Sequence, residues 1–183
     1  YGVSENKISF QKGQVLIGDE VKLSFAEVVD KAYLARISLS STGFYRTPKI
    51  KYDPKTLSGR PFFYFTYGAA VSEVIVDTLT GEYKLLRVDI LHDVGTSLNP
   101  AIDLGQVEGG FVQGMGWLTS EELVWNAGGG LSTHAPSTYK IPVCGDWPKE
   151  FNVELVNWSE NREETIYRSK AVGEPPLMLG ISV

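Results

Sequence analysis

The segment from Gly105 to Gly116 constrains the fold of this chain more than any other, because it carries five glycines in twelve positions. An interior glycine costs a helix roughly 0.5–1 kcal/mol relative to alanine, so a helix here needs compensation from its surroundings. Glycines at positions 105, 109 or 110, and 114 would lie near one helical face. A face without side chains lets another body approach the backbone closely.

Two interpretations of this glycine face remain open from the residues alone. In the first, which is favoured, the helix packs tightly against a sheet and nearby backbone satisfies the amide of Gln113. In the second, a ligand lies on the face and Gln113 offers it two donors and an acceptor. The segment has neither the Gly-Lys-Ser/Thr of a P-loop nor the G-x-G-x-x-G dinucleotide signature, so it does not name a ligand.

Start signals and apolar spacing predict three helices. Asparagine and proline precede the glycine-rich segment, and proline suits the first helical position. A serine followed three residues later by a glutamate forms a capping box before an apolar run with helical spacing. The helices are expected over residues 101–122, after Ser24, and from Pro175 onward.

Strand patterns are spread over most of the remaining chain, and the clearest is a hairpin that turns at residues 78–82. Strands and helices are mixed without a βαβ rhythm, which predicts an α+β fold with mixed, largely antiparallel strands and packed helices. Strands are expected within 7–23 and over 37–45, 61–77, 83–94, 123–125, 139–143 and 151–158, with an exposed loop over 46–60.

Composition excludes several functional classes. The 22 acidic and 17 basic residues give a net charge of −5, and the basic residues are scattered, which argues against nucleic acid as a partner. One cysteine, Cys144, allows no internal disulfide and no cysteine-rich metal site, and two histidines cannot supply a histidine-rich one. We expect no metal ligand in this chain, no membrane partner and a reducing, cytoplasmic location.

The two ends lead us to expect a piece of a longer polypeptide. Tyr1 stands where a methionine would be expected, and the apolar run from Leu177 to Val183 has nothing after it to complete a core. Residues 1–183 are therefore interpreted as a C-terminal fragment of a domain, with no internal boundary that the sequence marks.

Glu174 is the one carboxylate in an otherwise apolar stretch, and the prolines that follow it favour an extended backbone. Apolar neighbours such as Val172 and Leu177 would desolvate the carboxylate and make it a stronger base, as a general base requires. The positive end of a following helix would instead stabilise its ionised form. The two effects oppose each other, so a structural and a catalytic role are equally compatible with the pattern.

The other polar residues give weak signals. His92 and Asp93 are adjacent, so in a strand their side chains would point to opposite faces and would not form an acid–base pair. His134 lies in a loop rich in serine and threonine, which favours a surface position. Cys144 has no neighbouring sign of activation.

Several long motifs, in a fixed order from about residue 38 to the end, resemble the molybdenum hydroxylases, the family of xanthine dehydrogenases and aldehyde oxidases. Within this family the Glu-Pro-Pro of residues 174–176 resembles the xanthine dehydrogenase branch, since aldehyde oxidases tend to have Gly-Glu-Ser-Gly there. The matching motifs are Ser41 to Pro48, Phe65 to Gly68, Asp93 to Asp103, the glycine-rich helix, Ser137 to Pro142 and Lys170 to Gly180.

The resemblance implies a part of a molybdopterin-binding domain and a role for two residues. Gln113 matches the glutamine that contacts the pterin cofactor, and Glu174 matches the active-site base. The glycine face would then receive the pterin and its phosphate. The implied reaction is hydroxylation of hypoxanthine or xanthine, in which Glu174 takes the proton of a molybdenum-bound hydroxide that attacks the purine, while hydride passes to a sulfido ligand.

The resemblance also implies partners outside this chain. The 2Fe-2S clusters, FAD and NAD would bind in other domains or subunits of an oligomeric complex, together with the rest of the molybdenum subunit. The substrate-clamping arginine and a second pocket glutamate of the family lie upstream, so an isolated fragment is expected to be inactive. Two alternatives stay open: a related hydroxylase acting on aldehydes or other N-heterocycles, and a non-catalytic domain that keeps the fold.

Overall fold

The computed structural model describes residues 2–158 and 160–183. The chain divides into two compact units, Tyr1–Thr47 and Pro48–Val183, at a boundary that the sequence did not mark. Each unit has its own secondary structure and is described by itself.

The first unit is a small antiparallel sheet followed by a helix. After a short 3-10 turn, η1 (Glu5–Lys7), come β1 (Ile8–Gln11), β2 (Gln14–Ile17), β3 (Glu20–Ser24) and α1 (Phe25–Leu34), with sheet order β1-β2-β3. The Ser24 hydroxyl accepts from the backbone N–H of Glu27 at 3.2 Å, and the Glu27 carboxylate accepts from the Ser24 N–H at 2.8 Å. The predicted strands and capping box are therefore confirmed.

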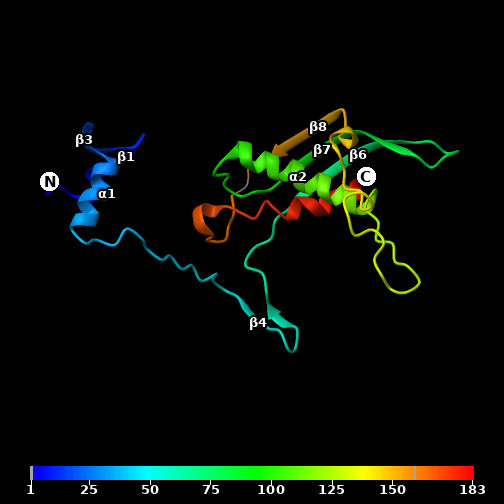
Figure 1. Cartoon of the computed structure of the whole chain (residues 1–183), viewed down its shortest axis with the longest axis horizontal. Helices are drawn as coiled ribbons and strands as arrows, with labels where there is room; N and C mark the ends of the chain where they lie inside the picture. Colours follow the sequence, from blue (N-terminus) through cyan, green and yellow to red (C-terminus); the bar gives the residue numbers. More distant parts are fainter. Residues whose placement is uncertain (1, 159) are drawn as a thin grey trace. The chain divides into compact units, whose positions relative to one another are not determined.

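A three-stranded sheet organises the second unit (Figure 1). β6 (Gly68–Val76) and β7 (Tyr83–His92) form the predicted hairpin, whose turn is closed by the Gly81 N–H donating to the Asp77 carbonyl at 2.8 Å. β8 (Glu150–Leu155) pairs with the other edge of β7 and runs parallel to it. A parallel neighbour needs a crossover connection, and this one contains the long helix α2 (Pro100–Leu118).

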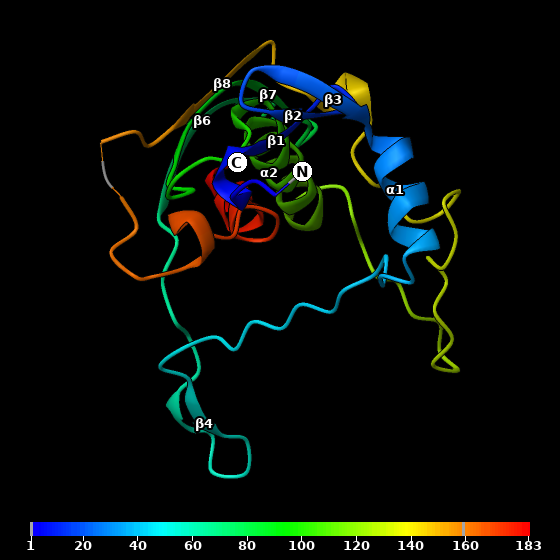
Figure 2. The ribbon, with the colours of Figure 1, turned by 90° about the vertical axis from the view of Figure 1, so that its left-hand side faces the viewer.

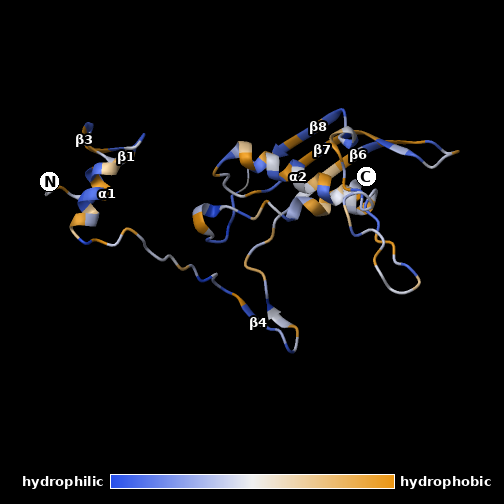
Figure 3. Ribbon diagram, in the orientation of Figure 1, coloured by the Kyte–Doolittle hydropathy of each residue, from blue (hydrophilic) through white to orange (hydrophobic). Residues whose placement is uncertain are grey.

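Helix α2 lies along one face of this sheet, as both ribbon views show (Figure 2). Its start is the predicted one: Asn99 is the N-cap, with its side-chain oxygen accepting from the Ile102 N–H at 3.4 Å, and proline occupies the first turn. The helix ends at Leu118, four residues before the predicted end. Hydrophobic positions of β7 and α2 (orange in Figure 3) meet in the core, which consists of Leu85, Val88, Ile90, Val107, Phe111 and Met115.

The chain closes the core with η4 (Pro175–Ser182), which packs on α2 and β6. This is the helix predicted from Pro175, but it is a 3-10 helix. Shorter elements complete the unit: β4 (Lys51–Asp53), β5 (Ser58–Arg60), η2 (Cys144–Asp146) and η3 (Ile166–Arg168).

Several strand predictions were wrong, and for one physical reason. Residues 37–45 are all described, form no strand and are exposed, because no neighbouring strand supplies hydrogen bonds to them. Residues 61–67 likewise form no strand before β6, with a single backbone hydrogen bond from Asp93 to Tyr67, and 123–125 and 139–143 contribute only a Trp125–Leu131 bridge. Conversely, the predicted loop 46–60 contains the β4–β5 hairpin. The α+β class itself is confirmed, and no helix among the described residues combines the length and apolarity needed to cross a membrane.

Candidate functional site

Four of the five glycines of α2 fall into two groups with different neighbours, and the fifth, Gly116, lies against Pro142 and Glu121. Gly110 and Gly114 are buried against η4. A Cβ atom on Gly114 would lie 1.9 Å from the Leu177 carbonyl oxygen, and one on Gly110 would lie 3.0 Å from Cβ of Pro176. Gly114 therefore admits the backbone of η4 at a distance that no other residue type would allow, whereas the contact at Gly110 is close but less strict.

Gly105 and Gly109 form the second group, and they are open. Nothing lies within 4 Å of the position that a Cβ atom would take at either residue. Gln113 is exposed and follows Gly109 at the same four-residue spacing, so the three residues share one side of the helix. We call Gly105, Gly109 and Gln113 the open side of α2, and Gly110 and Gly114 the filled side.

The structure thus divides the single glycine face that the spacing predicted. The tight-packing interpretation is correct for the filled side, although the partner is η4 rather than a sheet. For the open side the structure leaves room for a ligand, and the amide of Gln113 is accessible there. That division was hidden in the sequence because residues 109 and 110 are both glycine.

Glu174 stands immediately before η4, as its N-cap residue, and is exposed. Its backbone is α-helical, with φ −93° and ψ −39°, so the extended conformation predicted from the prolines is wrong. The preference of a residue before proline is overridden here because the Glu174 carbonyl accepts from the Leu177 N–H at 3.0 Å, which begins the 3-10 helix. The predicted desolvation of the carboxylate does not occur within this unit.

Contacts on both sides hold the backbone of Glu174. On the C-terminal side, Pro176 is buried against Gly110. On the N-terminal side, the Gly173 carbonyl oxygen lies 3.3 Å from the Cβ position of Gly110, and the Gln106 amide nitrogen lies 3.9 Å from the Cβ position of Gly173. Since Gln113 lies one helical turn after Gly110, the same α2–η4 contact fixes the backbones of both predicted site residues.

Upstream of Gly173 the chain is bound to the end of β7. The Lys170 N–H donates to the Val94 carbonyl at 2.8 Å, and the Ser169 hydroxyl donates to the Thr96 carbonyl at 2.8 Å. Gly95 has a φ of +62°, and a Cβ atom there would lie 2.3 Å from the Arg168 carbonyl oxygen. Only glycine suits both this conformation and this close approach.

A buried ion pair joins the same two segments. The Lys170 ammonium donates to the Asp93 carboxylate, and each side chain is only 9% exposed. The other Asp93 oxygen accepts from the Gly95 N–H at 2.9 Å, and the Lys170 ammonium lies 5.4 Å from the Tyr67 ring centroid. Sequence reasoning missed this pair, because its members are 77 positions apart and neither is unusual locally.

His92 points into the core, and within the described structure no group hydrogen-bonds its Nδ1 atom. Burial lowers the pKa of this imidazole below 6.5, and the nearby charge of Asp93 opposes that shift. The predicted absence of a His92–Asp93 acid–base pair agrees with the structure, in which Asp93 bonds Lys170 instead.

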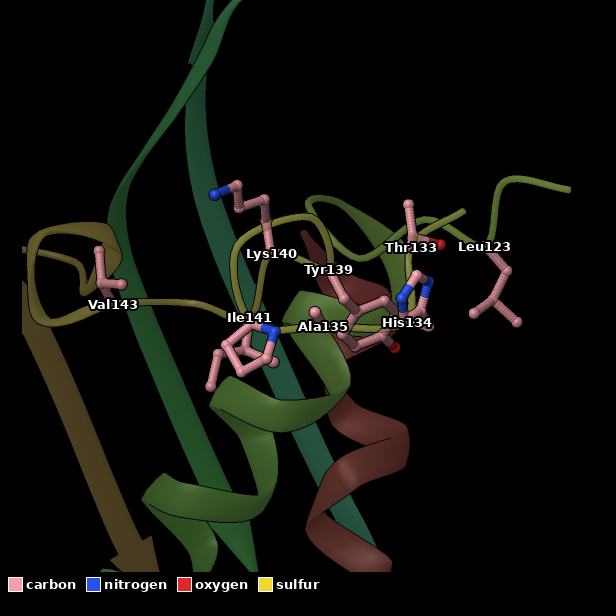
Figure 4. Close-up of a pocket in the computed structure, with 9 residues that line it drawn as sticks. Leu123, Thr133, His134, Ala135, Tyr139, Lys140, Ile141 and Val143 are labelled. Carbon is pink, nitrogen blue, oxygen red and sulfur yellow. The ribbon is translucent and has the colours of Figure 1, made fainter. Parts of the chain in front are cut away.

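The loop after α2 forms a separate hollow of about 540 Å³ (Figure 4). Pro142 anchors the loop against Gly116, and the Tyr139 hydroxyl donates to Glu121 at 2.5 Å. His134 lies there on the surface, as predicted, with Nδ1 2.8 Å from the Leu131 carbonyl oxygen. The lining consists of Leu123, Thr133, His134, Ala135, Pro136, Tyr139, Lys140, Ile141 and Val143, none of which belongs to the α2–η4 contact.

The described residues offer a ligand helix backbone, one amide and one carboxylate. Across the described residues, no three histidine, cysteine, aspartate or glutamate side chains gather as a metal-ligand set. The open side of α2 instead offers bare helix backbone and one amide, against which a flat polar ligand could lie. Glu174 offers an exposed carboxylate, on a backbone that is held at the start of the segment that contacts this helix.

A family model described as "Molybdopterin cofactor-binding domain" matches residues 1–148 of the chain, which include Gln113 but not Glu174. Over 160 residues the chain is 58% identical to the "Xanthine dehydrogenase/oxidase" of Felis catus. Over 162 residues it is 52% identical to the "Xanthine dehydrogenase" of Dictyostelium discoideum. Each alignment covers 87% of this chain but only 12% of the relative, so the chain spans about one eighth of the relatives' length.

Among solved structures, the chain is similar to an aldehyde oxidoreductase from Desulfovibrio gigas. The TM-score is 0.66 at 25% sequence identity, over 84% of this chain and 16% of that one.

Proposed function

This chain belongs to the molybdopterin cofactor-binding domain family, and we propose that in its full-length protein it forms one wall of a molybdenum hydroxylase active site that oxidises hypoxanthine and xanthine. The observation that carries the proposal is the α2–η4 contact. It leaves one side of α2 open for a cofactor while fixing the backbone of Glu174 beside the segment that packs on that helix.

The open side of α2 fits a pterin cofactor. The missing side chains at Gly105 and Gly109 let a flat ring system or its phosphate approach the helix backbone, and the Gln113 amide can both donate to and accept from it. When bound, the cofactor supplies the oxygen transfer and two-electron oxidation of the substrate. Iron–sulfur clusters and FAD, proposed for other domains of an oligomeric complex, would carry the electrons onward to NAD.

Glu174 is the proposed general base. It accepts the proton released as oxygen is transferred to the purine ring, and its fixed backbone limits the positions that the carboxylate can reach. Its exposure within this unit leaves the carboxylate accessible to substrate. The upstream parts of the protein would have to complete the pocket and exclude water from it.

Xanthine is favoured over an aldehyde as the substrate because the chain has higher sequence identity to xanthine dehydrogenases than to an aldehyde oxidoreductase. Identity to the two xanthine dehydrogenases is 58% and 52%, against 25% to the aldehyde oxidoreductase. The Pro175-Pro176 pair after Glu174 agrees with this preference. Oxidation of an aldehyde is the second candidate, because that enzyme has the same fold in this region.

Replacing Glu174 in the full-length enzyme tests the proposed base. We expect Glu174→Gln to lower kcat for xanthine by about 10²-fold or more while the molybdenum content stays unchanged, since a general base contributes on that scale. Glu164→Gln, at an exposed glutamate, is the matched control and should retain the rate. Wild-type turnover of Glu174→Gln would refute the base assignment, and faster turnover of an aldehyde than of xanthine by the parent enzyme would refute the substrate.

Gln113→Ala tests the cofactor contact separately. We expect less molybdopterin per purified protein, measured by metal analysis and pterin fluorescence, with the remaining loaded enzyme still active. Gln11→Ala, at an exposed glutamine of the first unit, should bind the normal amount. Unchanged cofactor content in Gln113→Ala would show that this amide does not contribute to binding.

A further inference from the structure

We infer that Lys170 and Asp93 are positioning residues for Glu174, which hold the segment carrying this carboxylate against the end of β7. The inference rests on the proposed function, because it assigns the pair a role only through the proposed base. It adds two residues, neither of which is expected to touch substrate or cofactor.

The pair lies at a junction of three segments. Asp93 directly follows β7, and its N–H donates to the Tyr67 carbonyl at 2.8 Å while its carboxylate accepts from Gly95 and Lys170. Lys170 lies on the strand-like segment that enters the Glu174 turn, with its ammonium near the ring of Tyr67. Two hydrogen bonds, with Tyr67 and Gly95, thus fix Asp93 independently of Lys170.

Little flexible chain separates Lys170 from Glu174. The Ala171 N–H donates to the Tyr64 hydroxyl at 2.9 Å, and Val172 packs partly buried against the core. Gly173 then contacts the filled side of α2. These contacts leave no slack between Lys170 and Glu174, so residues 170–174 dock as one segment and a change in the position of Lys170 changes the docking of Glu174.

The energetics favour a geometric role over a stabilising one. A buried ion pair loses hydration that its Coulomb attraction only partly restores, so apolar residues of similar volume often stabilise a protein equally well. A buried charge does, however, tolerate few alternative arrangements, since any other leaves it without a partner. The main consequence of the pair is therefore that residues 168–171 have one docked position.

Kinetics of the full-length, cofactor-loaded enzyme test the inference. We expect Lys170→Met to lower kcat for xanthine by about tenfold to 10²-fold, because a misplacement of about 1 Å has effects of that size. KM and molybdenum content should not change. In a Glu174→Gln background the same substitution should lower kcat no further, because both changes act through one group. A purely structural role predicts the same loss in both backgrounds.

Lys170→Met alone leaves the Asp93 charge buried and can prevent folding, so a second variant decides the question. Lys170→Met combined with Asp93→Asn removes both charges; we expect it to fold with bound cofactor and still show the reduced kcat. Lys49→Met, which breaks the solvent-exposed Lys49–Glu163 pair, is the matched control and should keep the wild-type rate.

Recovery of the wild-type kcat in the double variant, or equal losses in the two Glu174 backgrounds, would overturn the inference. These outcomes are distinct from failure of the proposed function. Wild-type turnover of Glu174→Gln overturns both, whereas loss of activity in Glu174→Gln with full activity in the Lys170 variants overturns the positioning role alone.

Discussion

The two sides of α2 carry the same residue type and meet opposite surroundings. On the filled side, Gly110 and Gly114 are packed against the backbone of η4, whereas on the open side nothing lies within 4 Å of the Cβ positions of Gly105 and Gly109. On the filled side, the absence of side chains allows close internal packing. On the open side it allows no contact within the described structure, although each glycine still lowers the stability of the helix.

This difference teaches how a glycine-rich helix can combine two roles. The filled side determines where the Glu174 segment lies. The open side of the same helix leaves a surface free for a ligand. Substitutions that add one methyl group at a time should therefore have effects that differ in sign between the two sides.

The largest effect is expected for Gly114→Ala. The new Cβ atom would lie 1.9 Å from the Leu177 carbonyl oxygen, which is backbone and cannot rotate away, so η4 must move. We expect a loss of about 3 kcal/mol or more in unfolding free energy, at the upper end for an overpacked core. Thermal unfolding of the full-length protein measures this loss, and a melting temperature equal to wild type would show that the filled side is not tightly packed.

Gly110→Ala should have a smaller effect. Its Cβ atom would lie 3.0 Å from Cβ of Pro176, so a shift of a few tenths of an ångström accommodates it. The gain in helix propensity offsets much of the strain, and we expect a net change within about 1 kcal/mol. A destabilisation as large as that of Gly114→Ala would mean that η4 cannot shift at all.

Gly109→Ala, one position earlier, tests the open side. With no atom near the new methyl group, the helix should gain about 0.5–1 kcal/mol. If a cofactor lies on this side as proposed, molybdopterin content should fall although the protein becomes more stable. A stabilised protein with full cofactor content would place the cofactor elsewhere.

The smallest effect concerns His92, whose Cδ2 atom lies 3.1 Å from the Cβ position of Gly68, the same position that the side chain of Leu179 in η4 approaches. Burial lowers the pKa of His92 below the 6.5 expected in the unfolded chain, so the unfolded state binds more protons between the two values. The contribution of His92 to stability is therefore constant above about pH 6.5 and falls as the pH drops below it.

The comparison of wild type with His92→Gln isolates this contribution. Between about pH 7.5 and about pH 5.5 the wild-type protein should lose more unfolding free energy than the variant, with a slope of at most one proton. Equal pH dependence of the two proteins would show that His92 is not the group that titrates.

Local signals in the sequence predicted local structure well. The capping box at Ser24, the Asn99-Pro100 helix start and the turn of the β6–β7 hairpin all depend on residues within a few positions of one another. Strand predictions were wrong for segments that have no neighbouring strand, such as residues 37–45, because a strand forms only by hydrogen bonding to a chain beside it.

Within the candidate site, the sequence predicted which residues to consider but not their surroundings. Gln113 and Glu174 were singled out by their sequence surroundings and given their roles by resemblance, and both roles remain proposals. The division of the glycines and the Lys170–Asp93 pair depend on contacts between segments more than sixty residues apart, which no local pattern encodes. The helical backbone of Glu174 likewise follows from the docking of η4 and not from the preference before proline.

The distance in sequence between α2 and η4 also sets an order of assembly. The filled side of α2 is covered only when Leu177, 63 positions after Gly114, has docked on it. A loop of that size is slow to close. During synthesis the helix therefore emerges with an apolar, side-chain-poor surface exposed, which is the kind of surface that chaperones bind and that aggregates form upon. Because the segment that covers it also carries Glu174, the folding step that ends this exposure is the one that sets the proposed base in place.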